Sequence, residues 1–419
     1  MGRVIGYDLN DLSCQVSIGL ENGAHDSGSS EKRITNEEVV SVPVIVGSEK
    51  YVIPLAAFIN SDGEISYGED AVRSAKDQSE LITNLFSMAQ KGESFVKNGE
   101  TYLYTDLLSG FMKKTIYMTS VLSPMDLIER VVIALPDISA DCIHTVEQAA
   151  SFLSEMDISY RIAGYSECFF YYAMNQDEAL TRNKIALFDY DGETVRSMLL
   201  VTRVDVRPHI CMVEEKDFDM TSKSDLSFLD IARSVLDSEI VSAVYLSGEG
   251  FEGNWLKSSV AYLCERKRRV FQGRNLYTKG ACYAGIDDRD GNPLLNSCSF
   301  FDDDRLVSNI GIYMIRDGQE IYVPLLEAGI HWYEAHISTE FYLGDDKEIR
   351  LKLQSFFTKD VRYSVVRCET FPERPSRCTR VRLELEMKDN SCIICRAHDL
   401  GFGEIYRSSG DIIEQEVFI

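Results

Sequence analysis

At 419 residues the chain is longer than one hydrophobic core usually holds, so we expect two or three domains. Hydrophobic residues make up 45% of the sequence and charged residues 26%, which is typical of globular proteins, and no apolar run is long enough to span a membrane. The net charge of −24 argues against a nucleic-acid partner, because its phosphates would be repelled.

The N-terminal residues begin a strand almost at once and lack the basic region and apolar core of a signal peptide. Eleven cysteines, an odd number, lie mostly in apolar segments. We therefore expect a cytoplasmic protein with reduced thiols and no membrane partner.

The first part of the chain has the pattern of strands followed by helices. Alternating apolar residues predict a hairpin at 3–8 and 14–20, and a polar, Gly- and Ser-rich loop follows at 22–36. A β-rich stretch covers 39–46 and 51–59.

Helical periodicity then predicts helices at 69–90 and 106–122, with Asp106 placed to cap the second. A βα unit follows, with an apolar strand at 131–135 and a helix from Ser139 to Met156 that Ser139 can cap.

Ile185–Leu200 is the stretch around which the chain is organised, and it has the pattern of a strand, an acidic turn and a second strand. A weaker twin lies at Val4–Ile18. Each stretch places an aspartate, Asp189 or Asp8, at the end of an apolar strand where a turn begins. We expect the two turns to face each other across a cleft.

The other elements of this α/β part are predicted at 158–163 (strand), 166–180 (helix), 200–206 (strand), 226–237 (helix), 241–246 (strand), 254–264 (helix) and 280–286 (helix). Beyond about residue 300 helical periodicity vanishes, and strand-like runs are found at 308–315, 320–326, 330–342, 348–356, 361–367, 380–387 and 391–397. The pattern predicts an α/β domain at 1–287 and an all-β sandwich at 300–419.

Several segments of the α/β part occur in a specific order: IGYDLNDL (5–12), a long helix within 99–122, VVIALPD (131–137), IAGYSECFFYYAM (162–174), FDYDGET (188–194), AVYLSGEG (243–250) and NLYTKGACYAG (275–285). In this order they resemble the nucleotide-binding domain of the seventy-kilodalton heat-shock chaperones, in the actin-like ATPase superfamily. The β part, above all 308–312 and 380–397, resembles the peptide-binding sandwich of that family, without its helical lid.

The resemblance implies a duplicated ribonuclease H-like fold that holds ATP and Mg²⁺ between two phosphate loops and an adenosine loop. It assigns nucleotide binding to Asp8, Asp189, Gly192, Thr194, Gly248 and Gly250, coupling between domains to Pro136 and Glu167, and peptide binding to Ile312.

Both phosphate loops depart from the family pattern. In the first, Asn10-Asp11-Leu12 stands where the family has Gly-Thr-Thr, so the flexible glycine and both hydroxyls are lost. In the second, Asp191 and Glu193 replace glycines, and a later family aspartate falls at Arg196.

Two further departures concern the rest of the nucleotide site. The register of the family's catalytic lysine falls on Ala89, and Lys91 lies two positions further on. Only residues 201–242 separate the second phosphate loop from the adenosine loop, which is too short for the helical lobe that completes the adenine pocket. We therefore predict an actin-like domain that lacks one lobe, and no residue is assigned as catalytic.

The predicted cleft gathers six carboxylates, from Asp8, Asp11, Glu167, Asp189, Asp191 and Glu193. Two like charges 4 Å apart repel by about 4 kcal/mol at an effective dielectric constant near 20, and a triphosphate would add to this repulsion. Asp8 and Asp189 alone are compatible with Mg²⁺ and a nucleotide, and a divalent-cation site is a weaker alternative, since hard cations prefer carboxylate oxygens.

Other candidate motifs have ordinary explanations. Cys392 and Cys395 have the spacing of a metal or thiol pair, but in a strand they point to opposite faces, so we interpret them as core thiols and predict no metal site there. The basic run at 266–269 is interpreted as positive charge at a helix C-terminus.

The leading hypothesis is a degenerate chaperone-like protein that does not hydrolyse nucleotide and serves as a scaffold or as a module that binds a peptide or protein. The alternative is a nucleotide-binding chaperone with slow, Mg²⁺-dependent ATP hydrolysis. A protein partner is expected in either case.

Overall fold

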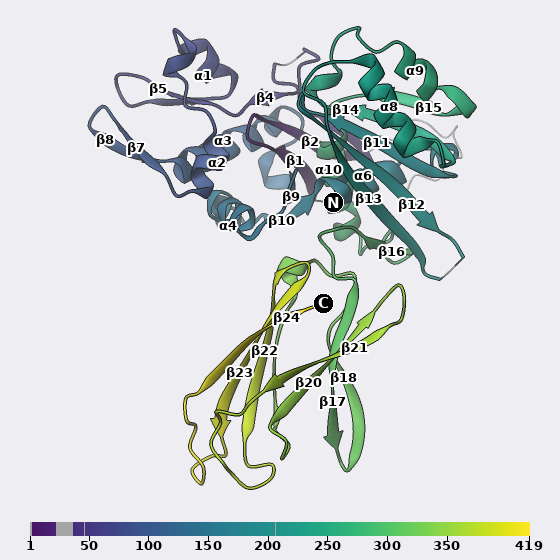
Figure 1. The fold of residues 1–419 in the computed structure, drawn as a ribbon. Helices are drawn as coiled ribbons and strands as arrows, with labels where there is room; N and C mark the ends of the chain where they lie inside the picture. The colour runs from purple at the N-terminus through teal and green to yellow at the C-terminus, as the bar shows by residue number, and fades with distance from the viewer. Residues whose placement is uncertain (1, 22–36, 46, 206) are drawn as a thin grey trace. The chain divides into compact units, whose positions relative to one another are not determined.

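The computed structural model describes residues 2–21, 37–45, 47–205 and 207–419, so the loop predicted at 22–36 lies outside the described residues (Figure 1). The chain divides between Phe300 and Phe301 into two compact units. None of the described helices is both long and apolar enough to cross a membrane.

The first unit is mixed α/β, and two large sheets lie at its centre (Figure 1). One sheet has the strand order β10-β9-β1-β2-β3, with β4 paired to β2, and its strands are β1 (Arg3–Leu9), β2 (Ser13–Glu21), β3 (Glu37–Ser41), β4 (Ile53–Pro54), β9 (Ile128–Leu135) and β10 (Ser159–Gly164). The other has the order β15-β14-β11-β12-β13-β16, and its strands are β11 (Lys184–Tyr190), β12 (Thr194–Arg203), β13 (His209–Asp219), β14 (Val241–Ser247), β15 (Arg269–Gln272) and β16 (Cys298–Phe301).

The two sheets repeat one arrangement of strands. β1 pairs antiparallel with β2 and parallel with β9, and β11 pairs antiparallel with β12 and parallel with β14. Asp8 and Asp189 occupy equivalent places in this repeat, each next to the last residue of its strand. The strand–turn–strand pattern predicted for both stretches is therefore confirmed.

Helices cover the sheets in layers (Figure 1). The α-helices of the first unit are α1 (Glu69–Ser74), α2 (Leu85–Gln90), α3 (Tyr104–Tyr117), α4 (Ala140–Ala149), α5 (Ser151–Glu155), α6 (Tyr165–Met174), α7 (Glu178–Thr181), α8 (Asp225–Leu236), α9 (Ser258–Leu263) and α10 (Leu276–Arg289). Buried side chains of α3 and α4 pack on the first sheet, those of α8 and α9 on the second, and those of α6 and α10 join a core shared by both sheets.

The central helices α6 and α10 approach each other closely. A Cβ atom on Gly280 of α10 would lie 1.9 Å from the carbonyl oxygen of Cys168 in α6, so this crossing requires glycine. On its other side α10 packs on β1, where a Cβ on Gly6 would lie 2.0 Å from the carbonyl oxygen of Thr278.

Short segments complete the first unit. Two hairpins are formed by β5 (Ala57–Ile59) with β6 (Ile65–Tyr67) and by β7 (Ser94–Lys97) with β8 (Glu100–Leu103). The 3-10 helices of this unit are Gln78–Glu80, Met118–Val121, Met125–Leu127, Glu249–Phe251 and Glu265–Lys267.

Several predicted elements differ from the structure. The helix predicted at 69–90 is broken into three short helices, because the backbone is extended at Ala75 and again at Leu81. Asp106 does not cap α3: the helix begins two residues earlier, and the capping position is Leu103. Ser139 does cap α4, with its Oγ accepting a hydrogen bond from the backbone N–H of Cys142, as predicted.

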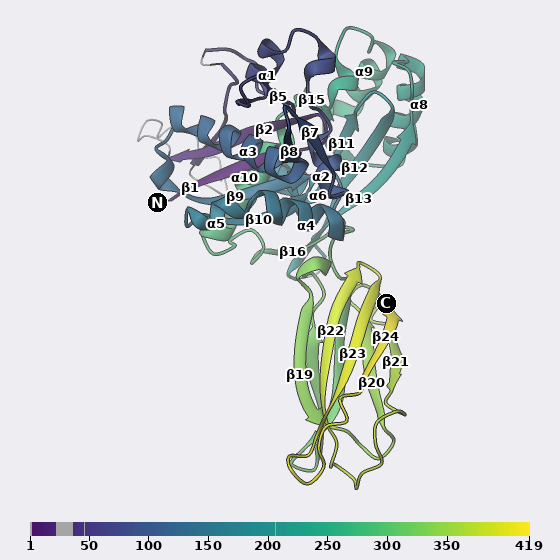
Figure 2. The same cartoon turned by 90° about the vertical axis from the view of Figure 1, so that its left-hand side faces the viewer.

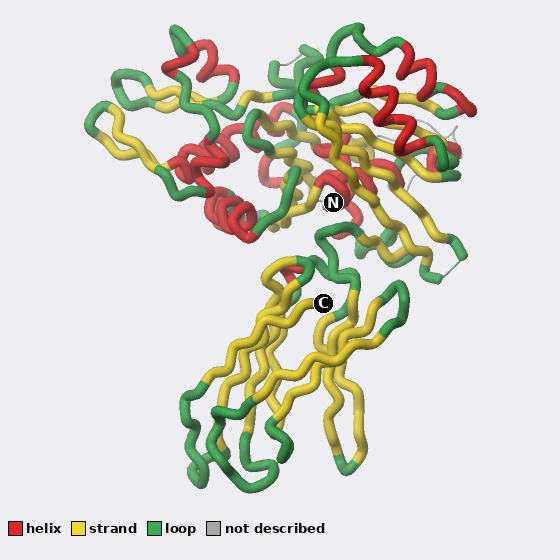
Figure 3. The backbone as a smooth tube through the Cα atoms, viewed as in Figure 1, coloured by secondary structure: helices red, strands yellow, loops and turns green. Residues whose placement is uncertain are grey.

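The second unit consists of two four-stranded antiparallel sheets that lie face to face (Figures 2 and 3). One has the order β18-β17-β20-β21, and its strands are β17 (Ser308–Arg316), β18 (Gln319–Leu326), β20 (Glu348–Ser355) and β21 (Val361–Arg367). The other has the order β19-β22-β23-β24, and its strands are β19 (His336–Tyr342), β22 (Arg380–Asp389), β23 (Cys392–Gly401) and β24 (Ile412–Phe418), with a 3-10 helix at Trp332–Glu334. The predicted all-β character is confirmed, and β24 was missed.

Candidate functional site

A cleft of about 500 Å³ opens in the first unit between the two halves of the repeat. Its described lining is Asp8, Asn10, Asp11, Leu12, Ser13, Gln15, Val52, Pro136, Asp137, Tyr165, Asp189, Asp191, Thr194, Arg196, Asp217, Ser247, Gly248, Glu249, Arg274 and Tyr277. The predicted cleft therefore exists, and both turns that were expected to face each other line it.

Two stacked tyrosines lie between the paired aspartates. The rings of Tyr165 and Tyr277 are 3.6 Å apart between centroids and 12° from parallel. The Tyr165 hydroxyl donates to Asp8 Oδ1 at 2.7 Å, and the Tyr277 hydroxyl donates to Asp189 Oδ2 at 2.7 Å. Tyr165 begins α6 and Tyr277 lies in the first turn of α10, so the close packing of these helices brings the rings together.

The environment of this quartet favours neutral side chains. The pKa of Asp8 is raised to about 7: burial raises it, the hydrogen bond from Tyr165 lowers it, and the nearby Asp189 raises it. Burial also raises the pKa of Asp189. The pKa values of Tyr165 and Tyr277 lie well above the ordinary range, first through burial and then through the facing carboxylates.

The first loop satisfies its own backbone donors. Asn10 Oδ1 accepts hydrogen bonds from the backbone N–H groups of Leu12 (3.0 Å) and Ser13 (2.9 Å), which is an Asx turn. Asp11 Oδ1 accepts from the backbone N–H of Ser87 at 3.0 Å, in the first turn of α2. In this loop a side chain thus occupies the N–H groups that a phosphate would need.

The second loop does the same at the equivalent position. Asp191 Oδ1 accepts from the backbone N–H groups of Glu193 and Thr194, both at 2.8 Å. Gly192, which lies between Asp191 and Glu193, has φ +112° and open space around it, as a turn residue does. The side chains of Asp191 and Glu193 are exposed, so both of these carboxylates retain much of their hydration.

The loop that follows β14 packs on the loop that follows β11. Gly248 has φ +95°, and a Cβ there would lie 2.3 Å from the carbonyl oxygen of Tyr190 and 2.6 Å from Asp189 Oδ1. A Cβ on Gly250 would lie 2.1 Å from the Tyr190 ring. Gly248 lines the cleft, whereas Gly250 lies against this buried ring, so its glycine is explained by packing.

Arg196 connects the two halves of the cleft. Its Nη1 donates to the Pro136 carbonyl oxygen at 2.7 Å and its Nη2 to Asp137 Oδ1 at 3.0 Å, while Nε lies 3.3 Å from Asp217 Oδ1. Sequence reasoning noted that arginine replaces an aspartate here, but it did not foresee this bridge.

The charge of the cleft is strongly acidic. Of the described lining residues, seven carry a carboxylate and two, Arg196 and Arg274, carry a cation, and none is a lysine. Ala89 is buried in α2, and Lys91 follows that helix outside the lining.

Four residues assigned by resemblance are not among the described residues that line the cleft: Gly192, Gly250, Glu167 and Ile312. Glu167 is 1% exposed in α6 and pairs with Arg161 at 3.1 Å, and Arg161 also binds Asp288 at 2.6 Å. In the second unit Ile312 is only 2% exposed, so in this structure it offers no surface to a peptide. Peptide binding at this position stays a prediction.

The described residues contain no group of three or more His, Cys, Asp or Glu side chains arranged to hold a metal ion, so the divalent-cation alternative gains no support. Cys392 and Cys395 are both buried free thiols.

Sequence reasoning missed the stacked tyrosines and the capping role of Asn10. Both tyrosines lie in segments that had been singled out, IAGYSE and NLYTKG, each at the start of a helix that follows a strand or loop. The signal that could have revealed the pair is a tyrosine near the start of each of these two helices.

Comparison with known proteins gives a family but no activity. The description "Family of unknown function (DUF5716) C-terminal" matches residues 38–302, and "Domain of unknown function (DUF8552)" matches residues 305–419. No curated protein matches the chain.

Proposed function

Because the chain belongs to the family of unknown function DUF5716, whose description states no activity, we propose a function from the cleft itself. We propose that the chain is a chaperone-like scaffold that does not hydrolyse nucleotide and that binds a protein or peptide partner. In this proposal the first unit is a reduced actin-like, ribonuclease H-like domain, and the second is a relative of the chaperone peptide-binding sandwich.

The repeat of strand pairing supports the fold relation. A first strand that is antiparallel to the second and parallel to the next occurs twice, and the two copies meet at equivalent aspartates. Between β12 and β14 the described residues form one further strand, β13, and one helix, α8, which agrees with the loss of one helical lobe. Fold alone assigns no activity, so the cleft chemistry carries the functional part.

The single observation that carries the proposal is that backbone N–H groups of both loops already donate to side chains of the same loop. Phosphate loops bind through backbone N–H groups that point at the ligand. Here Asn10 Oδ1 and Asp191 Oδ1 each accept from two of those groups, at 2.8–3.0 Å. A phosphate would have to displace both side chains, and Asp191 would also repel it.

The remaining electrostatics oppose a nucleotide in the same way. The described lining has seven carboxylates against two arginines, and Arg196 is already engaged with Pro136 and Asp137. The cation expected near Ala89 is absent from the described lining.

Calorimetry with ATP and Mg²⁺ tests the proposal. We expect no binding to the unmodified chain at concentrations up to about 1 mM, a level at which a genuine nucleotide site would be readily seen. Micromolar binding that Asp189→Ala abolishes would overturn the proposal. The double variant Asn10→Gly, Asp191→Gly is the matched test of cause, because it frees four loop N–H groups and should increase affinity for ATP.

A second candidate, slow ATP hydrolysis, is favoured by one observation. A cleft of about 500 Å³ between Asp8 and Asp189 is within the size range of small-molecule sites. This alternative predicts phosphate release above that of a Gly192→Asp control, which obstructs the second loop. Equal release from both proteins would rule it out.

A further inference from the structure

The two outward faces of the second unit differ in chemistry. On the sheet formed by β19, β22, β23 and β24, oppositely charged side chains pair across the strands: Arg382 with Glu340, Arg396 with Glu386 and Glu414, and Lys388 with Glu416. On the same sheet, His398 Nε2 lies 3.1 Å from Glu384 Oε2. Most of the charge on this face is therefore balanced within the face.

The outward face of the other sheet carries a group of exposed tyrosines around one lysine. We call this group the tyrosine–lysine platform; it consists of Tyr322 (β18), Tyr313 (β17), Lys352 (β20) and Tyr363 (β21). The three tyrosines are 36%, 44% and 59% exposed in the order Tyr322, Tyr313, Tyr363. The platform crosses all four strands from one edge of the sheet to the other.

Strand alternation fixes the direction of these side chains. Ile310 and Ile312 of β17 are buried, so Tyr313 emerges on the opposite face. Leu351 and Leu353 of β20 are buried in the same way, which turns Lys352 outward. Tyr322 is directly opposite Tyr313, and Tyr363 is directly opposite Lys352, so the platform is built into the strand register.

Lys352 is held by the aromatic rings. Its Nζ lies 4.9 Å from the centroid of Tyr322 and 5.5 Å from that of Tyr313, and it donates to the Tyr313 hydroxyl at 3.4 Å. No carboxylate among the described residues lies within 4.0 Å of this ammonium group, whereas neighbouring Arg350 pairs with both Asp346 and Glu348. In a chain with a net charge of −24, Lys352 is thus a cation placed among exposed apolar rings without an acidic partner.

We infer that the tyrosine–lysine platform binds an acidic, apolar-rich peptide segment of a partner protein. Exposed tyrosines supply large contact area at little cost in conformational entropy, and the lysine supplies charge complementarity to a carboxylate. Tyr363 lies on β21, at one edge of this sheet. The inference extends the proposed function and rests on one part of it, namely that the partner is a protein.

Fluorescence anisotropy of the full chain with a short labelled peptide of alternating Glu and Phe residues tests the inference. We expect saturable binding that weakens with added salt, and a loss of affinity of about tenfold or more in Lys352→Glu. Tyr363→Ala should also weaken binding, which provides a test that leaves the lysine in place.

The matched control is Lys388→Glu on the other outward face, where the lysine pairs with Glu416; affinity for the peptide should not change. A peptide of alternating Lys and Phe should not bind. Equal binding of both peptides, an unchanged affinity in folded Lys352→Glu, or binding only to an anionic polysaccharide or to anionic lipid vesicles would overturn the inference. Each of these outcomes leaves the ATP calorimetry unaffected, so failure here is distinct from failure of the proposed function.

Discussion

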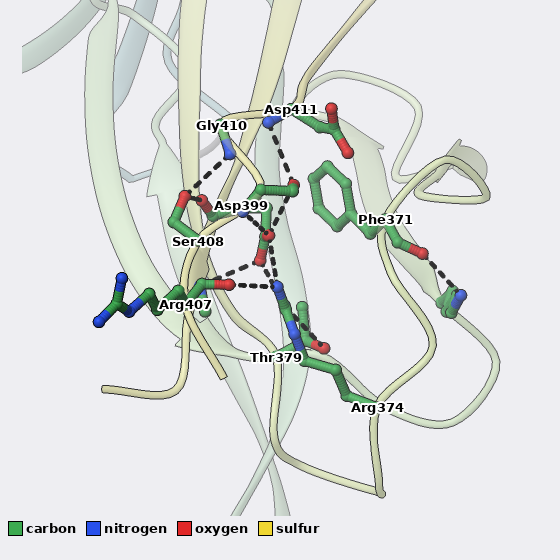
Figure 4. A network of polar contacts seen from close by, with 11 residues as sticks. Phe371, Arg374, Thr379, Asp399, Arg407, Ser408, Gly410 and Asp411 are labelled. Atoms are coloured by element: carbon green, nitrogen blue, oxygen red, sulfur yellow. Dashed lines mark hydrogen bonds and ion pairs between the residues drawn. The ribbon is translucent and has the colours of Figure 1, made fainter. Parts of the chain in front are cut away.

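Each unit contains a buried aspartate, and the two carboxyl groups have different hydrogen-bond partners. In the second unit the Asp399 side chain is 0% exposed and receives Arg374 through two hydrogen bonds, of 2.6 and 2.7 Å, together with the backbone N–H and hydroxyl of Ser409 (Figure 4). In the first unit Asp8 is 3% exposed and receives the neutral hydroxyl of Tyr165, with the acidic Asp189 nearby.

The pKa values follow from these neighbours. The hydrogen bonds from Arg374 and Ser409 lower the pKa of Asp399 despite its burial, whereas burial raises the pKa of Asp8 to about 7. Arg374 also donates to the Arg407 carbonyl oxygen at 2.9 Å, so the ion pair fastens two loops to the end of β23 (Figure 4). Asp399 is therefore a structural carboxylate paired with a cation, whereas Asp8 is hydrogen-bonded by a neutral hydroxyl and has the raised pKa that is common in functional sites.

The largest expected effect comes from breaking the neutralised pair. Arg374→Ala leaves the Asp399 carboxylate buried without a cation, and removing one partner of a buried pair costs about 3 to 5 kcal/mol. We expect the unfolding free energy of the second unit to fall by this amount, measured by urea denaturation with hydrogen exchange of the β23 amides as the local readout.

Arg382→Ala is the matched control for this variant. Its ion pair with Glu340 is 43% and 39% exposed, so its loss should cost at most about 1 kcal/mol. Similar losses in the two variants would mean that the Asp399 pair is not the buried anchor described above.

The next largest effect is expected at Asp8, through which the unfolding free energy of the first unit should depend on pH. Because the pKa of Asp8 is raised to about 7 in the folded state, the stability tied to its proton is fully present below about pH 4 and is lost as pH rises through 7. Asp8→Asn removes this loss, so at about pH 8 the variant should be more stable than the unmodified chain by up to about 4 kcal/mol. At about pH 4 the two proteins should differ little.

Urea denaturation at both pH values measures this difference, with hydrogen exchange of the β1 amides to locate it. The control is Asp62→Asn, a substitution in the exposed turn before β6, which should change the unfolding free energy by no more than about 0.5 kcal/mol. An Asp8→Asn variant that is destabilised equally at both pH values would contradict the raised pKa. The pair Arg374–Asp399 predicts the reverse trend for the second unit, since a lowered pKa gives stability that is lost only as pH falls below about 4.

The roles of these aspartates differ in how well they can be predicted from the sequence. Asp8 and Asp189 were predicted as cleft residues because an apolar strand that ends in an acidic turn is a local signal, readable within a dozen residues. Asp399 lies in a strand pattern with nothing local to mark it. Its partner Arg374 is 25 residues away in a loop, and only folding brings the two together.

The same reason explains what was missed around the cleft. The Tyr165–Tyr277 stack depends on the crossing of α6 and α10 at Gly280, more than 100 residues apart in sequence. β13 was not predicted because its second half is mostly charged, and it becomes a strand by pairing with β12 along its length. Local patterns thus gave the repeat and its turns, while the chemistry between its halves required tertiary contacts.

A smaller effect is expected from the neutral donors of the cleft. Tyr277→Phe removes the 2.7 Å hydrogen bond to Asp189 and leaves a half-buried carboxylate with one donor fewer, at a cost of about 1 to 2 kcal/mol. The loss should be smaller than for Arg374→Ala, since no cation is removed. Thermal denaturation of Tyr277→Phe beside Tyr342→Phe, an exposed tyrosine in β19, measures it. Equal stability of the two variants would contradict the assigned hydrogen bond.

The smallest effect is expected in the self-capped loops. Asp191→Ala removes the acceptor of the Glu193 and Thr194 backbone N–H groups and should cost about 1 kcal/mol, as the loss of a cap does. Both amides should then exchange with solvent faster, which hydrogen exchange by NMR resolves residue by residue. Glu193→Ala is the matched control, because it removes an exposed carboxylate from the same turn and keeps that acceptor. If the amides exchange equally fast in all three proteins, Asp191 does not hold the loop donors, and the strongest physical argument against phosphate binding is lost.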